Sequence, residues 1–213
     1  MQRLDIEDPA RPGLEDTIDF INTLEHSRHG DREHLPTAAA AIAWLVERGL
    51  LDGATVAARP EPTTAEPPAD EQDASILARI HRARAALRAV VDAIVERRPP
   101  DPVAVAEVNR LLAGGPAPIL VPVADGVGVA ERARADPIDA ALGRLAEPLV
   151  GLLERGERDR LRTCADATCR WVFYDASRAG RRRWCDMATC GNRAKAARHR
   201  ARQGTQPAGA RPA

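Results

Sequence analysis

Apolar residues recur every three or four positions through most of the first 157 residues, which is the period of an amphipathic α-helix. The longest such run lies between Asp73 and Arg97, and Pro99 and Pro100 end it. Its apolar positions are Ile76, Leu77, Ile80, Ala83, Leu87, Val90, Val91, Ile94 and Val95. The pattern predicts one long helix with a single face packed against a core.

Two shorter helices are expected before this one, because residues that cap helices precede apolar-periodic segments. Asp16 and Thr17 are expected to cap a helix whose apolar face ends at Leu24. Thr37 is expected to be the N-cap of the next helix, which Gly49 stops.

Two further helices are expected after the long one. Asp101 precedes a helical pattern over residues 103–112, and Asp136 precedes another over residues 138–153. A proline follows each of these aspartates, in the first helical position that proline favours. Pro148 lies inside the second pattern and predicts a kink or a break at the residue before it.

The strand signal of this part of the chain is confined to residues 118–129, where two apolar runs flank Asp125–Gly126 and predict a short hairpin. Residues 58–72 are rich in proline and lack an apolar period, so a mobile loop is expected there. The predicted fold is therefore mainly α (α+β). It consists of a helical domain over residues 1–157 with one hairpin, followed by a small C-terminal module.

Several polar residues of the helical domain invite a functional interpretation. Polar and apolar residues alternate from Asp19 to Thr23, but we prefer a plain helix face on which Asn22 caps or hydrogen-bonds locally. His26, His29 and His34 lie close together in the sequence. Because no common helical spacing links these three, a second metal site is not expected.

Four arginines follow the polar side of the longest predicted helix, where either a phosphate site or a solvated face is conceivable. They are Arg79, Arg82, Arg84 and Arg88. We prefer the solvated face, because exposed charged faces are common on amphipathic helices. The domain also lacks a glycine-rich phosphate loop and a nucleophile elbow, so its sequence indicates no reaction.

All the cysteines of the chain fall within 27 residues, as two C-x4-C pairs separated by fifteen residues. They are Cys164, Cys169, Cys185 and Cys190. Two close pairs separated by an insert of hairpin length are typical of a tetrahedral site formed by four thiolates. We predict one structural Zn²⁺ bound by these four residues.

Disulfides and buried free thiols are the alternatives to a metal site. Disulfides require an oxidising compartment, whereas the stretch that begins Met1–Asp5 contains no apolar run typical of a signal peptide. Buried free thiols would be scattered through the core rather than clustered. The sequence contains no stretch of 18 or more apolar residues, so no membrane-spanning segment is expected. The lack of a signal-peptide pattern predicts a cytoplasmic location.

Charge is distributed unevenly, although the formal net charge of the chain is zero. Residues 1–157 hold 17 arginines and 27 acidic residues, a net charge of −10, whereas residues 158–202 have a net charge of +9. A basic module on an acidic body is typical of nucleic-acid binding, and the alternative is that the two parts neutralise each other. The abundance of Arg, Ala and Pro with a single Lys is typical of a high-GC bacterial genome.

The segment between the cysteine pairs predicts a hairpin. Arg170–Asp175 is aromatic and β-prone, and Arg181–Trp184 follows a polar turn. Trp171, Phe173 and Trp184 are expected to form a small core, with base stacking as the alternative. Since a module of this size buries little surface, metal binding is expected to supply much of its folding free energy.

An alanine-rich basic segment follows Cys190 and predicts a helix that runs to Arg202. Gly191 is expected to adopt a positive φ that lets the second cysteine pair continue directly into this helix. The side expected to pack consists of Ala194, Ala197 and Ala201. Residues 203–213 are expected to form a disordered tail.

The stretch Cys185-x4-Cys190-Gly191-Asn192-Arg193-Ala194-Lys195 resembles the signature of the CGNR zinc finger. Residues 164–175, with Arg170-Trp171-Val172-Phe173-Tyr174-Asp175 after Cys169, and Arg182–Cys185 are similar to the rest of that finger. Asp19–Leu24 resembles the opening of the ABATE domain, with Thr17 where that family usually has a large apolar residue. The ABATE domain precedes this finger in bacterial proteins proposed to be stress-induced transcription regulators. The resemblance implies an ABATE-like domain over 1–157, a CGNR-type finger over 158–202, and DNA binding.

The leading hypothesis is therefore a DNA-binding transcriptional regulator, whose helical domain senses a small-molecule effector or forms a homodimer. The expected nucleic-acid contacts come from the predicted hairpin and the final helix. They are Arg181, Arg182, Arg183, Arg193, Lys195, Arg198, Arg200 and Arg202.

Two alternatives stay open. The finger could be a protein-interaction module that docks on an acidic surface, or an RNA binder that uses its aromatic residues. An enzyme is the least favoured hypothesis, because four cysteine ligands leave no open coordination position for a substrate. The target sequence, the effector and the oligomeric state are not encoded in any pattern that we can identify.

Overall fold

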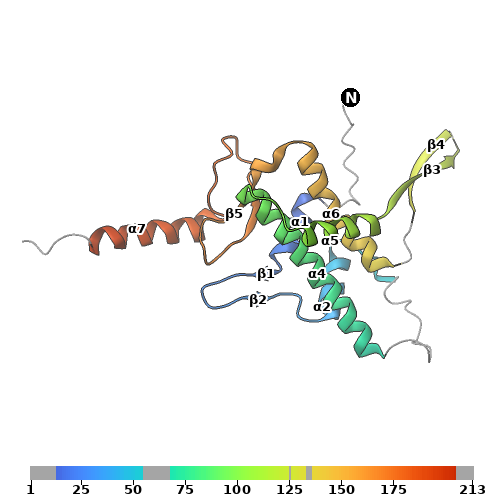
Figure 1. Ribbon diagram of the computed structural model, residues 1–213, viewed down its shortest axis with the longest axis horizontal. Helices are drawn as coiled ribbons and strands as arrows, with labels where there is room; N and C mark the ends of the chain where they lie inside the picture. The colour runs from blue at the N-terminus through green and yellow to red at the C-terminus, as the bar shows by residue number, and fades with distance from the viewer. Residues whose placement is uncertain (1–12, 55–67, 125, 133–135, 205–213) are drawn as a thin grey trace, which may run out of the picture.

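The computed structural model describes residues 13–54, 68–124, 126–132 and 136–204 (Figure 1). The fold is mainly helical, and its strands form small antiparallel sheets of two strands each. The predicted class, mainly α with a small C-terminal finger, is confirmed.

Helix α4 (Ala69–Glu96) is the longest helix and lies at the centre of the helical body. Helices α1 (Leu14–Asn22), α2 (Ala38–Glu47), α5 (Pro102–Gly114) and α6 (Pro137–Glu154) pack around it. Their apolar faces enclose one core. Its fully buried large side chains include Phe20, Leu45, Ile80, Leu87, Leu111, Leu142 and Leu145.

The capping residues determine where most of these helices begin. Thr37, Asp101 and Asp136 each accept a hydrogen bond from a first-turn N–H group, so these predicted caps are confirmed. Helix α1 differs, because it begins at Leu14 and Asp16 lies inside its first turn. The Asp16 carboxylate accepts a hydrogen bond from the N–H group of Gly13 at 2.9 Å, so it stabilises the helix start from within.

Two predictions about proline-containing segments need correction. Helix α6 continues without a break from Pro137 to Glu154, so the predicted break before Pro148 is wrong. The predicted mobile loop over 58–72 is too long at its end, because α4 already begins at Ala69. The part of that loop up to residue 67 lies outside the described residues.

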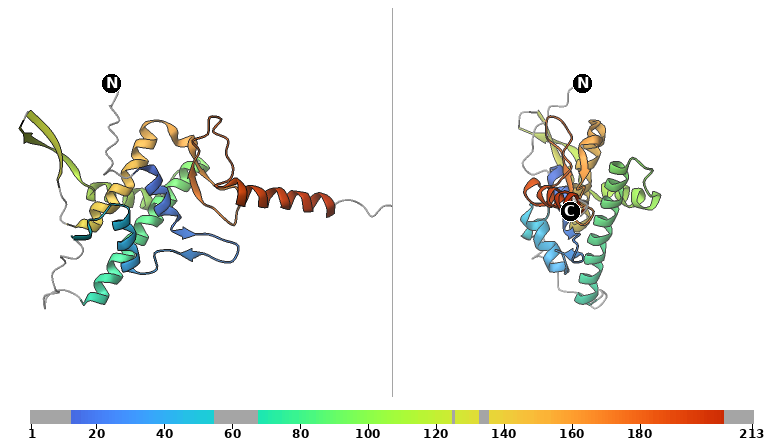
Figure 2. Two further views of the ribbon diagram at one scale, coloured as in Figure 1. Left: turned by 180° about the vertical axis from the view of Figure 1, so that it is seen from behind. Right: turned by 90° about the vertical axis from the view of Figure 1, so that its left-hand side faces the viewer.

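Two hairpins extend from the helical body. Strands β3 (Ala117–Val123) and β4 (Gly126–Arg132) form the predicted hairpin, which projects well away from the helices (Figure 2). Strands β1 (Leu24–Glu25) and β2 (Arg32–Glu33) form a second, very short hairpin. No sequence pattern predicts this hairpin, because strands of two residues are too short to show alternation.

Of the four arginines along α4, Arg82 is exposed as predicted, whereas the other three form ion pairs within the body. Arg84 is 5% exposed and pairs with Glu33, and its Nη1 also donates to Thr23 Oγ1 at 2.9 Å. Arg79 pairs with Asp136 and Asp139 at the start of α6, and Arg88 pairs with Asp92. The prediction of a solvated face is therefore wrong for Arg79, Arg84 and Arg88. Arg79 and Arg84 join separate elements of the body, and Arg88 joins neighbouring turns of α4.

The C-terminal module begins with η1 (Glu157–Arg160), a short 3₁₀ turn, and β5 (Leu161–Thr163). Strand β6 (Val172–Tyr174) pairs antiparallel with β5, so the hairpin encloses the first cysteine pair rather than the segment between the pairs. The predicted partner strand over 181–184 is wrong, because this stretch is irregular. The second pair leads through one π-helical turn, η2 (Met187–Gly191), into α7 (Asn192–Gly204).

The module shares its core with the helical body. Leu161 is 2% exposed and Val172 is fully buried, and both belong to the same cluster of side chains as the helical core. Phe173 is also buried, whereas Trp171 and Trp184 are only half-buried. The predicted small core of three aromatic residues is therefore replaced by a hairpin anchored in the larger core.

Helix α7 extends away from the body as an isolated rod (Figures 1 and 2). Its main contacts are with η2, and Ala197, on the side predicted to pack, is exposed. The helix reaches Gly204, so the predicted start of a disordered tail at residue 203 is wrong, and the rest of that prediction, over residues 205–213, lies outside the described residues. None of the helices in the described part of the chain is long and apolar enough to cross a membrane.

Candidate metal centre and nucleic-acid interface

The four cysteine sulfurs converge on one point. Each lies within 4.8 Å of every other, and the Sγ atoms of Cys169 and Cys185, like those of Cys185 and Cys190, are 3.7 Å apart. Four sulfurs at ~2.3 Å from a tetrahedral zinc ion would be separated by about 3.8 Å. No cysteine is in a disulfide. The donor set and its spacing thus fit a tetrahedral thiolate site.

Each cysteine pair belongs to a loop that we call a knuckle: residues 164–169 for the first and 185–190 for the second. An aspartate and a threonine fold both loops in the same way. Oδ1 of Asp166 accepts hydrogen bonds from the N–H and hydroxyl groups of Thr168, and Oδ1 of Asp186 does the same with Thr189. These hydrogen bonds lower the pKa of both carboxyl groups.

Backbone conformation at the two knuckles differs from the prediction. The residue with positive φ follows the first knuckle and is Arg170, with φ of 50°. Gly191 is absent from the left-handed region, so the positive φ predicted there is wrong. Gly191 instead gives room to Met187, whose sulfur would lie 2.4 Å from a Cβ atom at this position.

The thiols of this cluster cannot all ionise without a cation. Burial raises the pKa of Cys169 to about 11, and burial together with its thiol neighbours raises the pKa of Cys185 as well. Burial also acts on Cys190, but hydrogen bonds from Cys185 and Cys169 outweigh it and lower the pKa of Cys190. Ionisation of Cys169 and Cys185 is therefore unfavourable in the cluster, and a divalent metal would supply the positive charge that four thiolates require.

The Arg193 side chain contacts the cysteine cluster. Its Nη2 donates to Cys190 Sγ at 3.4 Å, and its Nε lies 3.2 Å from Oδ2 of Asp166 in the first knuckle. The side chain therefore links the first turn of α7 to both knuckles. The sequence predicts a nucleic-acid contact for Arg193, because a basic residue in a basic helix shows no sign of a contact with a cysteine.

The histidines near the N-terminus do not form a metal site. His26 Nδ1 is 2.8 Å from Oδ1 of Asp31, and His34 Nε2 is 3.0 Å from Oε2 of Glu25. Among the described residues, the one group of ligand side chains close enough to share an ion is the cysteine cluster.

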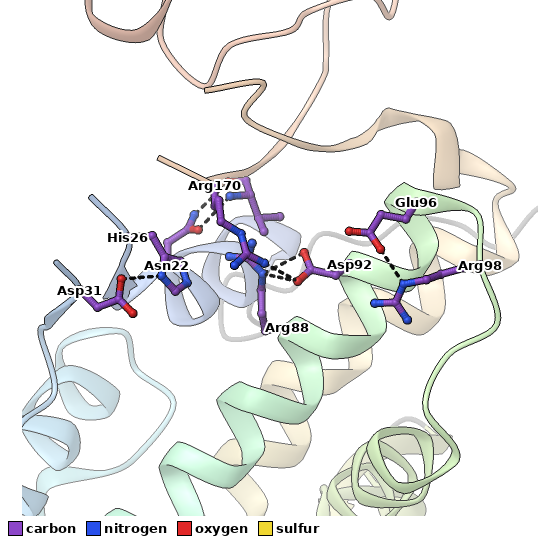
Figure 3. A network of polar contacts seen from close by, with 9 residues as sticks. Asn22, His26, Asp31, Arg88, Asp92, Glu96, Arg98 and Arg170 are labelled. Atoms are coloured by element: carbon purple, nitrogen blue, oxygen red, sulfur yellow. Dashed lines mark hydrogen bonds and ion pairs between the residues drawn. The ribbon is translucent and has the colours of Figure 1, made fainter. Parts of the chain in front are cut away.

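Asn22 joins the helical body to the first half of the finger. Its Nδ2 donates to the carbonyl oxygen of Val172 at 2.9 Å, and its Oδ1 accepts from the N–H group of Val172 at 2.9 Å. Arg170 adds a second link, with Nη2 3.4 Å from Oδ2 of Asp92, which also pairs with Arg88 (Figure 3). The predicted local role of Asn22 is therefore wrong.

Two of the predicted nucleic-acid residues before the second knuckle already contact the finger itself. The Arg182 side chain donates to the carbonyl oxygens of Trp184 and Cys185 and lies over the Phe173 ring, and its N–H group donates to buried Asp175 at 2.8 Å. The Arg183 guanidinium lies over the Trp184 ring. Arg181 is exposed.

Asp175 fixes the loop that carries these arginines. It is fully buried, and it also accepts a hydrogen bond from the N–H group of Ser177 at 3.0 Å. Hydrogen bonds from Ser177 and Arg182 lower the pKa of its carboxyl group. Sequence reasoning assigned this residue no role, although its place directly after an aromatic strand is a signal that could have been used.

The predicted basic residues of α7 beyond Arg193 occupy the projecting rod. Lys195, Arg198 and Arg200 are exposed, and no ion pair joins them to another described residue. Arg202 lies in the same helix. The structure therefore brings the predicted residues together as one basic helix, with Arg181 on the loop that precedes the second knuckle.

Comparison with protein families agrees with this arrangement. A family model named ABATE and described as "Putative stress-induced transcription regulator" matches residues 17–157, and a model for the CGNR zinc finger matches residues 160–203. No curated protein matches the chain. Since the first match covers most of the chain and the second covers the cysteine cluster, the chain belongs to the ABATE family and carries a CGNR zinc finger.

Proposed function

We propose that this protein is a DNA-binding transcriptional regulator in which one structural Zn²⁺, bound by the four cysteines, holds α7 in place. The observation that carries the proposal is the exposed basic helix α7, which leaves the second knuckle directly and extends away from the acidic body. The helical domain would receive an effector signal. A cytoplasmic location is proposed because reduced thiols remain available to the metal there.

The dimensions and chemistry of α7 suit a DNA groove. Its 13 residues span ~20 Å, and a single helix fits the ~12 Å width of the major groove. Lys195, Arg198 and Arg200 would contact phosphates or guanine edges. Arg181 and Arg183 would contact neighbouring phosphates of the DNA backbone. Arg182 and Arg193 leave this set, because they hold the finger together.

The metal itself is proposed to have no catalytic part. A zinc ion with four cysteine ligands has a closed coordination shell, whereas catalytic zinc keeps a position for water or substrate. Its contribution would be folding free energy and the orientation of α7.

We further propose a homodimer formed through the β3–β4 hairpin. Leu120 and Val129 are cross-strand partners, and with Val127 they form one apolar face whose members are 71–75% exposed. An isolated two-stranded ribbon is marginally stable, and a second copy offers an identical ribbon that can cover this face around a two-fold axis. In light scattering, the double substitution Leu120→Glu, Val129→Glu should give half the mass of the wild type. A monomeric wild type would refute this contact.

The DNA-binding proposal is tested with Arg198→Ala and Arg200→Ala in the full zinc-loaded chain, by titration against genomic duplex fragments at several salt concentrations. Each variant should bind more weakly, and each lost phosphate contact should reduce the slope of log K against log salt by about 0.9. Arg132→Ala, at the far hairpin, is the matched control and should leave affinity and slope unchanged. Unchanged binding in both α7 variants would remove this helix from the interface.

A protein-interaction role has one observation in its favour. Arg170 of the finger pairs with Asp92 of the body, so part of the finger's charge is already neutralised within the chain. If the full chain shifts neither DNA nor RNA at moderate salt while the finger still binds acidic proteins, this role replaces the first.

A further inference from the structure

A cavity of about 690 Å³ lies between α4, α5 and α6, with η1 at its mouth. This volume falls within the ~300–1,000 Å³ that is typical of sites for small organic ligands. Most of its wall is apolar and comes from the three helices. The principal wall residues are Val90, Ile94, Val108, Leu112, Leu149 and Leu153.

The apolar wall is not fully covered by the protein's own side chains. Val150 and Leu153 of α6 are 36% and 38% exposed, although both are large apolar residues next to a well-packed core. Burial of such side chains by a ligand is favourable, because their apolar surface is removed from water. The cavity therefore favours an occupant with an apolar body.

The mouth of the cavity is positively charged. Arg97, Arg98 and Arg158 line it, Asp159 is the single acidic residue of the lining, and Arg98 is already paired with Glu96. Nη2 of Arg97 lies 2.9 Å from Oδ1 of Asp159, but both side chains are largely exposed, so water and ions weaken this pair. Arg158 has no ion-pair partner among the described residues. An anionic head group would complement this rim.

The backbone of Arg97 is a second, independent indication. Arg97 has φ of 54° and ψ of 39°, at the position after α4 that glycine usually occupies. The N–H groups of Arg97 and Arg98 donate to the carbonyl oxygens of Ile94 and Ala93, as in a Schellman motif. This left-handed conformation carries a steric cost for arginine that glycine would not have. The presence of arginine here therefore indicates a role for its guanidinium at the mouth of the cavity.

We propose that this cavity binds a small amphipathic carboxylate. The apolar body would lie between α4, α5 and α6, and the carboxylate would bind Arg97 and Arg158, competing with Asp159 for Arg97. No covalent step is involved.

The cavity mouth is also connected to the finger, and the regulatory part of the inference rests on the proposed DNA-binding function. Asp159 is followed by Arg160, whose Nη1 donates to the carbonyl oxygens of Asp175 and Ser177 at 2.9 Å. These residues begin the loop that carries Arg181–Arg183. Displacement of Asp159 by a carboxylate would therefore alter η1 and, through Arg160, the position of that loop.

The test uses the full zinc-loaded chain with octanoate as the probe and octan-1-ol as its neutral analogue, by calorimetry and thermal shift. Octanoate should bind saturably and at least tenfold more tightly than octan-1-ol. Arg97→Gly should fold normally, since glycine suits the backbone there, and should lose this preference for the carboxylate. Leu153→Trp, which fills the mouth with a large side chain, should abolish binding of both probes.

Each contrary result is informative. Absence of saturable octanoate binding would overturn the proposed site. The site would also be overturned if the wild type bound octanoate and octan-1-ol equally well and Arg97→Gly changed neither affinity. Octanoate binding by a chain that binds no DNA would support the site and refute the proposed function alone. Octanoate binding that leaves DNA affinity unchanged would overturn the coupling through η1.

Discussion

The two knuckles of the finger are alike in sequence and internal hydrogen bonding but differ in what holds them. The first lies between β5 and β6, and the buried side chains of Leu161 and Val172 place this hairpin in the core of the helical body. The second continues into α7, whose main contacts are with η2. The first half of the finger is therefore built onto the body, whereas the second half depends on links to the first.

Those links are few. The N–H group of Ala165 donates to the carbonyl oxygen of Arg183 at 2.8 Å, and Arg193 reaches Asp166 and Cys190. Arg182 adds a hydrogen bond to Asp175 and lies over the Phe173 ring, and the proposed zinc would join both knuckles directly. Metal binding contributes ~10–16 kcal/mol to isolated zinc-finger peptides, and here we expect that free energy to act mainly on the second knuckle and α7. We therefore expect the metal to orient the basic helix, whereas apolar packing holds the hairpin in the body.

The largest expected effect comes from Cys185→Ser, which removes a ligand from the second knuckle. DNA affinity should fall by at least about 100-fold, because several phosphate contacts on α7 are lost together. The thermal unfolding of the helical body should change little. Circular dichroism and a mobility-shift titration measure both. Cooperative loss of the whole helical signal would show that the two halves are not separable in this way.

The reverse experiment weakens the first half. Asn22→Ala leaves the N–H and carbonyl groups of Val172 buried without partners, at a cost of about 1–3 kcal/mol each, so global stability should fall by ~2–6 kcal/mol. Asn192→Ala is the matched control at an exposed position and should cost less than ~1 kcal/mol. Urea denaturation compares the two. An equal loss in both variants would contradict the anchoring role of Asn22.

Arg193 and Lys195 separate metal support from DNA contact within one turn of α7. Arg193→Ala should weaken zinc binding by about 10–100-fold, because it removes a hydrogen bond to a ligand sulfur. Lys195→Ala should leave zinc affinity unchanged and weaken DNA binding only. Competition with a chromogenic chelator measures zinc affinity. Equal zinc affinities in the two variants would show that the Arg193 contact is not used.

The smallest effect concerns the β1–β2 hairpin of the body. Burial alone would raise the pKa of Glu33, but hydrogen bonds from Arg84 and Leu35 lower it. The pKa of Glu33 is therefore lower in the folded state than in the unfolded chain. The ion pair with Arg84 stabilises the fold fully above the unfolded pKa, and this stabilisation is lost as the pH falls through the folded pKa. Glu33→Gln should cost about 2 kcal/mol at pH 7 and progressively less below pH ~4, by urea denaturation across pH. A cost independent of pH would contradict an ionised Glu33.

Features encoded by neighbouring residues could be predicted from the sequence. The cysteine spacing predicted the cluster, and the caps at Thr37, Asp101 and Asp136 predicted three helix starts, because each depends on residues a few positions away. The basic helix after Cys190 was also expected, from alanine content alone.

Features that depend on distant partners could not be predicted. Asn22 bonds Val172, which lies 150 residues further along the chain. Strand β6 pairs with β5, which precedes Cys164, rather than with the predicted segment 181–184. Arg182 and Arg193 resemble phosphate-binding residues in sequence, yet each bonds a group that only the folded finger brings near. In each case tertiary contact decides the role of the side chain.

Hydrogen–deuterium exchange of the full chain, with zinc and after its removal by a chelator, tests most directly whether the metal joins α7 to the body. Amide protection should be lost in residues 181–204 and retained in β5, β6 and α4. Protection that survives throughout the second knuckle and α7 without zinc, or that disappears from β5 and β6 as well, would contradict this account.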